Sequence, residues 1–190
     1  MTTIYFIRHA QADNSIRDGR VRPLTEKGLR DRQLVTKFLR DKRIDAVLTS
    51  PFRRSIETIA PFAQQNGFEI ALVEDFRERE SDTNWDRSTY YTFMERQWAD
   101  FNYTLSDGEC LAEVQARNIA ALQQVLARHK DKNIVIGTHG TALSTIINFY
   151  DNTYGFQGFL AMLQILPWVV KMDFDGQTCT SIETIDLFNN

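Results

Sequence analysis

Cysteine is scarce in the sequence and long apolar runs are missing, which argues against two broad classes of protein. The 190 residues include only Cys110 and Cys179, so a disulfide framework is not expected. No run approaches the roughly 18 apolar residues that a membrane span needs. The N-terminal MTTIYFIRHA carries an arginine and a histidine where a signal peptide has its apolar region. We therefore expect a cytoplasmic protein with no membrane partner.

Signatures of the common metal-dependent and nucleotide-dependent enzymes are also missing. The sequence contains no H-E-x-x-H, no cluster of Cys and His ligands, and no carboxylate-rich segment of the kind that two-metal hydrolases need. It contains neither a P-loop nor a G-x-G-x-x-G motif. We therefore expect the protein to work without a metal ion and without a cofactor.

Neither sign of charge dominates the chain, whose formal net charge is -3. This balance gives the molecule no overall attraction to nucleic acid. The charges are nevertheless spread unevenly, since residues 1–54 hold 13 of the 22 Lys and Arg but only 6 of the 25 Asp and Glu. Such an asymmetry fits either an anion-binding half or the solvated basic face of one helix, and both interpretations stay open.

The chain does contain an alternation of strand-like and helix-like segments. Short apolar runs rich in β-branched and aromatic residues predict strands at 3–7, 46–49, 68–73 and 133–137. Helical spacing of apolar residues predicts helices at about 26–42, from Pro51 onward, at about 109–130 and at 141–150. Two further strand-like runs, 169–174 and 180–187, flank the hairpin signal Asp175-Gly176. This pattern predicts an α/β fold, a three-layer α/β/α sandwich whose mostly parallel central sheet has helices on both faces and a hairpin near one edge.

The first helix and the segment 79–108 carry more specific expectations. Thr25 is a good N-cap for the first helix, and Leu29 is expected on its inner face. Segment 79–108 is rich in aromatic and charged residues, and we expect it to form an insertion or lid on a single domain spanning 1–190. Its aromatic residues either pack the insertion onto the domain or help to contact a substrate. The candidates for substrate contact are Arg79, Trp85, Arg87, Tyr90 and Arg96.

Two of the three histidines directly follow predicted buried strands. His9 comes after TIYFIR, and His139 comes after IVIGT. Ligands bind beyond the carboxyl ends of parallel strands, so both imidazoles would project into one crevice if these strands are neighbours. The third histidine, His129, lies near the end of a predicted helix, where a solvated histidine is favourable. The pattern makes His9 and His139 candidate site residues.

Arginines lie beside the same strand ends. Arg8 precedes His9, and Arg53-Arg54 follow the strand at 46–49. A guanidinium binds phosphate through two parallel N–H groups, and a buried arginine without an anion is unfavourable. A surface position is an alternative for Arg53, but it suits Arg8 less well because Arg8 adjoins a buried strand.

These residues form part of a longer series of motifs that resembles the histidine phosphatase superfamily, which includes the phosphoglycerate mutases. The motifs are IRHA at 7–10, SPFRRSIET at 50–58, FRE at 76–78, GE at 108–109 and GTHG at 137–140. They occur in the family's order and spacing, and the matches span residues 4 to 141. Three positions depart from the family pattern. Ala10 replaces the more usual glycine, Thr138 stands where serine is common, and Asp31 stands where the family often has glutamine.

The resemblance implies a role for each matched residue. His9 would be the nucleophile that becomes phosphohistidine, and Glu78 would be the acid that protonates the leaving group. Arg8, Arg54 and His139 would hold the phosphoryl group, and the S-P-x-x-R pattern selects Arg54 over its neighbour. The weaker candidates for phosphate binding are Asn14 and Thr138.

The chemistry of these residue types fits the implied roles. His9 must be neutral to attack phosphorus, and two neighbouring guanidiniums disfavour its protonated form. Its other ring nitrogen needs an acceptor, for which we expect a loop carbonyl. Phosphoryl transfer spreads negative charge over the equatorial oxygens. Arg8, Arg54 and a protonated His139 would balance that charge where other phosphatases use metals.

Hydrolysis of a phosphate monoester is the favoured reaction, with phosphoglycerate mutase activity as the alternative. The resemblance implies that mutases tend to be longer, with a C-terminal tail that helps to close the site, whereas about 50 residues follow His139 here. A catalytically dead phosphate-binding protein is a second alternative, but it would be expected to have lost His9 or an arginine. The expected partner is a small phosphorylated substrate, and the sequence indicates neither which one nor the oligomeric state.

Overall fold

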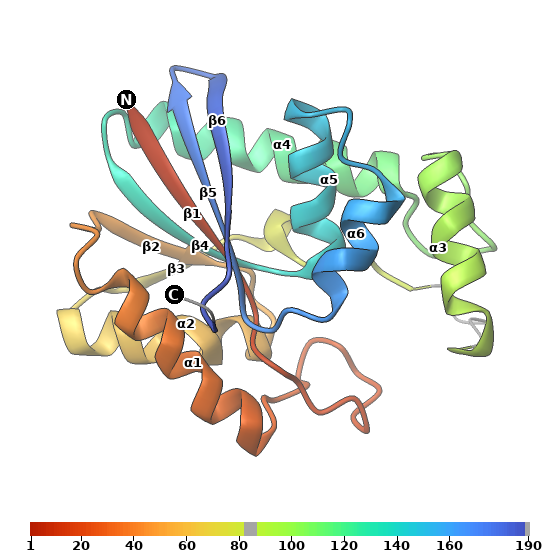
Figure 1. The fold of residues 1–190 in the computed structure, drawn as a ribbon, viewed down its shortest axis with the longest axis horizontal. Coiled ribbons are helices and arrows are strands. Elements are labelled where there is room, and N and C mark those ends of the chain that lie inside the picture. The colour runs from red at the N-terminus through yellow and green to blue at the C-terminus, as the bar shows by residue number, and fades with distance from the viewer. Residues whose placement is uncertain (82–86, 189–190) are drawn as a thin grey trace.

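Six strands form one sheet in the computed structural model, which describes residues 1–81 and 87–188 (Figure 1). The strands are β1 Thr2–Arg8, β2 Ala46–Thr49, β3 Ile70–Leu72, β4 Asn133–Thr138, β5 Trp168–Asp175 and β6 Thr178–Ile185. Their order across the sheet is β3-β2-β4-β1-β5-β6. The first four strands pair in parallel, and the β5–β6 hairpin continues the sheet antiparallel to β1. The predicted parallel sheet with a hairpin at one edge is confirmed.

Helices cover both faces of this sheet (Figure 1). The helices on one face are α1 Glu26–Leu39 and α2 Arg53–Asn66. Those on the other face are α3 Tyr90–Ala99, α4 Leu111–Arg128, α5 Gly140–Tyr150 and α6 Phe156–Leu163. Two short 3-10 helices, η1 Glu74–Phe76 and η2 Arg87–Thr89, lie between β3 and α3. The predicted three-layer sandwich is confirmed.

Strand β1 shows why the sheet is buried on both sides. Ile4 and Phe6 point into the core beneath α3 to α6, whereas Tyr5 and Ile7 point into the core beneath α1 and α2. A strand covered on both faces needs apolar residues at every position, which is what the run TIYFI supplies. Arg8 is the first charged residue of β1, and it therefore lies at the carboxyl end of the strand.

Several element ends differ from those that the sequence predicts. Helix α1 ends at Leu39, and α2 begins at Arg53, so Pro51 precedes the helix instead of opening it. Helix α6 was not predicted. Leu29 is 39% exposed, although it was expected on the inner face of α1. The buried face of α1 includes Gly28 instead, because a Cβ there would lie 2.1 Å from the carbonyl oxygen of Gln11 in the loop that crosses it.

Helix α3 anchors the segment 79–108 to the rest of the domain. Phe93 and Met94 are buried in the main core, and the Trp98 ring lies 5.7 Å from Phe159 and 6.1 Å from Tyr154 of the α5–α6 region. These residues therefore pack α3 onto the core, which fits the packing interpretation of the aromatic residues in this segment. Among the described residues, no helix has the length and apolar character needed to cross a membrane.

Candidate active site

The carboxyl ends of neighbouring strands bring the two candidate histidines together. Strands β1 and β4 pair in parallel up to Arg8 and Thr138, so the next residues, His9 and His139, emerge side by side. Their ring centroids are 5.3 Å apart. Strand β2 ends beside β4, and its next residue, Ser50, joins the same group. The condition that the sequence analysis set, that the two strands are neighbours, is therefore met.

The hydrogen bonding of His9 defines its reactive nitrogen. Its Nδ1 lies 2.7 Å from the carbonyl oxygen of Ala10, which is the loop carbonyl that the sequence left unidentified. Because a carbonyl only accepts, Nδ1 carries the proton and Nε2 carries the lone pair. Burial, followed by the positive charges of Arg54 and Arg8, holds the pKa of His9 well below its usual value. The imidazole is therefore neutral, as expected for a nucleophile.

Two buried arginines flank this imidazole. Arg8 and Arg54 are 7% and 4% exposed, and burial lowers the pKa of each to about 10, so both remain cationic at neutral pH. Arg8 Nη1 donates to the carbonyls of Met162 and Ile165 at 2.5 and 3.1 Å, and Arg54 Nη1 donates to that of Gly19 at 2.5 Å. Carbonyls orient a guanidinium without neutralising it. The pair is therefore suited to hold an anion.

The neighbouring arginine behaves differently. Arg53 lies on the surface, where its Nε pairs with Glu57 Oε1 at 2.7 Å one turn along α2. Arg54 is thus the arginine of the pair that faces the site, as the S-P-x-x-R pattern indicates.

The carboxyl group of Glu78 is held by backbone donors. Its carboxylate oxygens accept hydrogen bonds from the N–H groups of Thr141 at 3.0 Å and Ala142 at 3.1 Å, in the first turn of α5. The N–H of Arg79 donates to it as well, at 2.9 Å. Carboxylates are stabilised at helix N-termini by free N–H groups and the helix dipole. These contacts fix where the carboxyl group lies.

A cavity of about 560 Å³ connects these groups. Its lining residues are Arg8, His9, Gln11, Ala12, Asn14, Arg22, Arg54, Glu78, Arg79, Ser81, Tyr90, Tyr91, Thr141 and Leu166. The nucleophile candidate, both arginines and the candidate acid thus share one chamber, and Asn14 borders it. Arg79 and Tyr90 of the insertion also border it, so the substrate-contact interpretation of segment 79–108 fits these two residues.

Other candidates from the insertion lie elsewhere. Arg96 donates to the hydroxyl of Tyr103 at 3.3 Å and is absent from the cavity lining. Trp85 lies outside the described residues, as does the side chain of Arg87.

His139 departs from its sequence-based description in two ways. It is fully buried and lies behind His9, outside the lining of the cavity. Burial, together with Arg54 and His9, holds its pKa well below the usual value, which opposes the expected protonation of the imidazole. Its Nε2 lies 2.8 Å from Ser50 Oγ, and Nδ1 has no hydrogen-bond partner within the described part of the chain.

The hydroxyl of Ser50 holds the His139 ring in place. Ser50 Oγ also accepts a hydrogen bond from the N–H of Phe52 at 3.2 Å. A hydroxyl has one donor and two acceptor sites, so Ser50 can pair with either tautomer of the imidazole. Ser50 thus fixes the orientation of the ring next to His9.

Thr138 does not reach the cavity, contrary to its assignment as a phosphate ligand. It is fully buried, and its hydroxyl donates to the carbonyl of Phe76 at 3.4 Å. Its own carbonyl accepts from the N–H of His9 at 3.2 Å. Thr138 thus supports the strand end, whereas Thr141 is the threonine that borders the cavity.

Arg22 and Thr141 are cavity residues that sequence reasoning missed. Arg22 reaches the site because the loop at 10–24 folds back on itself, with a bridge between Ala12 and Leu24. Its Nη1 donates to Asn14 Oδ1 at 3.1 Å. The basic bias of residues 1–54 was the one signal that pointed toward such a residue. No three His, Cys, Asp or Glu side chains within 1–81 and 87–188 are grouped as metal ligands would be.

Known proteins resemble the chain in both sequence and fold. The model of the histidine phosphatase superfamily (branch 1) matches residues 4–179. Phosphoserine phosphatase 1 of Hydrogenobacter thermophilus is 26% identical over 73% of this chain and 71% of its own. The probable phosphoglycerate mutase GpmB of Yersinia pestis is 27% identical over 78% of this chain and 74% of its own. The solved structure of YhfR from Bacillus stearothermophilus superposes with a TM-score of 0.77 at 25% identity, covering 94% of both chains.

Proposed function

Because the chain belongs to the histidine phosphatase superfamily (branch 1), we propose that it hydrolyses a small phosphate monoester through a phosphohistidine on His9. The observation that carries this proposal is the neutral His9 imidazole, whose Nδ1 is bonded to a carbonyl and which lies beside two buried guanidiniums. One cavity joins these groups to the carboxyl group of Glu78. The resemblance to a phosphoserine phosphatase supports a small substrate.

The proposed first step transfers the phosphoryl group to the enzyme. Arg8 and Arg54 bind the equatorial oxygens. The lone pair of His9 Nε2 forms a bond to phosphorus while the bond from phosphorus to the leaving oxygen breaks. Glu78 gives its proton to that oxygen, so the product leaves as an alcohol.

The second step restores the enzyme. The Glu78 carboxylate removes a proton from water as the water oxygen attacks phosphorus, and the P–N bond to His9 breaks. Inorganic phosphate leaves, His9 Nε2 regains its lone pair, and Glu78 again holds the proton. The same carboxyl group thus acts as acid and then as base, and no metal is needed to balance the charge.

Mutase activity is the second candidate, favoured by the resemblance to GpmB. A mutase must retain the phosphoryl group and exclude water while the substrate turns. Of the described residues beyond His139, only Thr141 and Leu166 border the cavity, and the rest form α5, α6 and the sheet hairpin. This arrangement leaves the chamber without a C-terminal cover in the described part of the chain, which supports hydrolysis.

Hydrolysis of p-nitrophenyl phosphate is expected to proceed equally well with and without EDTA, and without 2,3-bisphosphoglycerate. The physical reason is that two arginines already supply the positive charge that a metal would provide. Initial rates measured with and without EDTA, each in the presence and in the absence of 2,3-bisphosphoglycerate, test this. Activity abolished by EDTA would contradict metal independence, and interconversion of phosphoglycerates that needs bisphosphate priming would favour the mutase.

Replacing Glu78 with glutamine is expected to reduce turnover of alkyl phosphates by about 10²-fold or more and that of p-nitrophenyl phosphate by much less. An alkoxide needs a proton to leave, whereas p-nitrophenolate is a stable anion. The ratio of kcat/KM for the two substrates measures the effect. Glu80→Gln is the matched control, since Glu80 is a neighbouring carboxylate whose side chain is 55% exposed. Equal losses of Glu78→Gln on both substrates would rule out Glu78 as the acid.

A further inference from the structure

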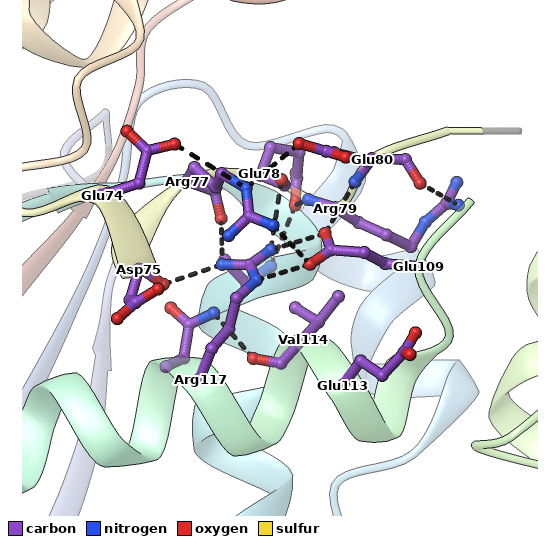
Figure 2. Close-up of polar contacts among 12 residues, drawn as sticks. Glu74, Asp75, Arg77, Glu78, Arg79, Glu80, Glu109, Glu113, Val114 and Arg117 are labelled. Atoms are coloured by element: carbon purple, nitrogen blue, oxygen red, sulfur yellow. Dashed lines mark hydrogen bonds and ion pairs between the residues drawn. The ribbon is translucent and has the colours of Figure 1, made fainter. Parts of the chain in front are cut away.

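A cluster of buried charges lies directly behind Glu78 (Figure 2). It consists of Arg77, Glu109 and Arg117, whose side chains are only 12–16% exposed. Arg117 and Glu109 are absent from the cavity lining. Helix α4 supplies Arg117, and Glu109 immediately precedes its N-cap. The sequence motif GE at 108–109 had no assigned role.

Every N–H of the Arg117 guanidinium has an acceptor. Nη1 donates to the carbonyls of Asp75 at 2.7 Å and Arg77 at 2.9 Å, and Nη2 donates to that of Glu78 at 3.2 Å. The remaining two donors bind Glu109, through Nε at 2.8 Å and Nη2 at 2.9 Å. A guanidinium has five N–H donors in a rigid planar fork. Arg117 therefore uses all five N–H donors, and three of them bind the backbone carbonyls around Glu78 (Figure 2).

Glu109 connects Arg117 to the residues on either side of Glu78. Besides Arg117, its carboxylate accepts from Arg77 Nη2 at 2.7 Å and from the N–H of Glu80 at 2.9 Å. Its own N–H donates to the carbonyl of Glu80 at 3.0 Å. Burial alone would raise the pKa of Glu109, but the hydrogen bonds from Arg117 and Glu80 hold it below its usual value. The carboxylate stays charged and fixes residues on both sides of Glu78.

We infer that Arg117 and Glu109 are positioning residues for Glu78, an inference that rests on the proposed role of Glu78 as the acid. The main chain of Glu78 is bound to α4 through Arg117, and its carboxylate is bound to α5 through Thr141 and Ala142. These two anchors together determine where the carboxyl group lies relative to His9. A displacement of about 1 Å in a catalytic group can cost about 10²-fold in rate.

The test compares Arg117→Lys with Glu78→Gln on an alkyl phosphate and on p-nitrophenyl phosphate. Lysine keeps the charge but not the planar fork, so it cannot reproduce the five contacts. We expect about a 10²-fold loss on the alkyl phosphate and a much smaller one on p-nitrophenyl phosphate. Glu109→Gln should show the same pattern, because an amide cannot accept from all four donors. Arg128→Lys, an exposed arginine on the same helix, should change neither rate.

A double variant separates positioning from general support of the fold. If Arg117 acts through Glu78, then Glu78→Gln/Arg117→Lys should be no slower on the alkyl phosphate than Glu78→Gln alone. Additive losses, or equal losses on both substrates in Arg117→Lys and in Glu109→Gln, would overturn the positioning role and leave the proposed function intact. Equal losses on both substrates in Glu78→Gln would instead overturn the proposed acid, and this inference with it.

Discussion

Replacing His9 with alanine is expected to lower phosphate monoester turnover by on the order of 10⁴-fold or more. Alanine removes the lone pair that we propose bonds to phosphorus. Arg8 and Arg54 keep their positions, because their hydrogen bonds run to the carbonyls of Met162, Ile165 and Gly19 and not to His9. Phosphate binding should therefore survive while turnover is lost, and the variant separates binding from chemistry.

Two measurements check this expectation. Hydrolysis of p-nitrophenyl phosphate should fall as stated, and inorganic phosphate should still raise the Tm of His9→Ala. Substrate carrying labelled phosphate should leave an acid-labile label on the wild type and none on the variant. His129→Ala is the matched control, because His129 is the C-cap of α4 and does not border the cavity. Undiminished hydrolysis by His9→Ala would contradict its role as nucleophile.

Much of the fold and the centre of the candidate site could be predicted because they depend on local patterns. Apolar runs ending in a polar residue mark buried parallel strands, and two such runs place His9 and His139 at the same sheet edge. The family's S-P-x-x-R pattern selects Arg54 over Arg53, and the structure buries the first and exposes the second. Each of these inferences concerns residues that follow a strand within a few positions.

The remaining features depend on contacts between distant segments. Leu29 has helical spacing but is 39% exposed, whereas its neighbour Gly28 is buried against the loop at Gln11. The lowered pKa of His139 results mainly from complete burial, which no local pattern contains. In the sequence Arg117 is an ordinary charged residue of α4. Its role depends on hydrogen bonds to the carbonyls of Asp75 in η1 and of Glu78, which lie about 40 residues away in the chain. The sequence therefore predicts the groups proposed to react, His9 and Glu78. It does not predict that Arg117 and Glu109 hold Glu78 in place.

Replacing Arg54 with methionine is expected to make the protein more stable while it abolishes activity. Burial lowers the pKa of Arg54 from 12.5 to about 10, so at neutral pH its charged form is less favourable in the folded chain than in the unfolded one. That difference corresponds to roughly 3 kcal/mol. Methionine removes the buried charge, but it loses one hydrogen bond to Gly19, worth about 1 kcal/mol, and the contact of the guanidinium with the Phe52 ring, worth about 0.5–1 kcal/mol. The free energy of unfolding should rise by roughly 1–2 kcal/mol.

Thermal unfolding and kinetics test the two halves of this expectation. A gain of about 1 kcal/mol raises the Tm of a domain of this size by about 2–4 °C. Turnover should fall by about 10³-fold, because an arginine that balances transition-state charge contributes at least that much. Inorganic phosphate should raise the Tm of the wild type, and it should raise that of Arg54→Met far less.

The adjacent arginine provides the control for this variant. Arg53→Met removes an exposed ion pair with Glu57, so activity should be unchanged and stability should change by no more than about 0.5 kcal/mol. If Arg54→Met were less stable than the wild type and still active, Arg54 would serve the fold and not the phosphoryl group. Higher stability with lost activity would mean that the chain keeps a destabilising buried cation because the phosphoryl group needs it.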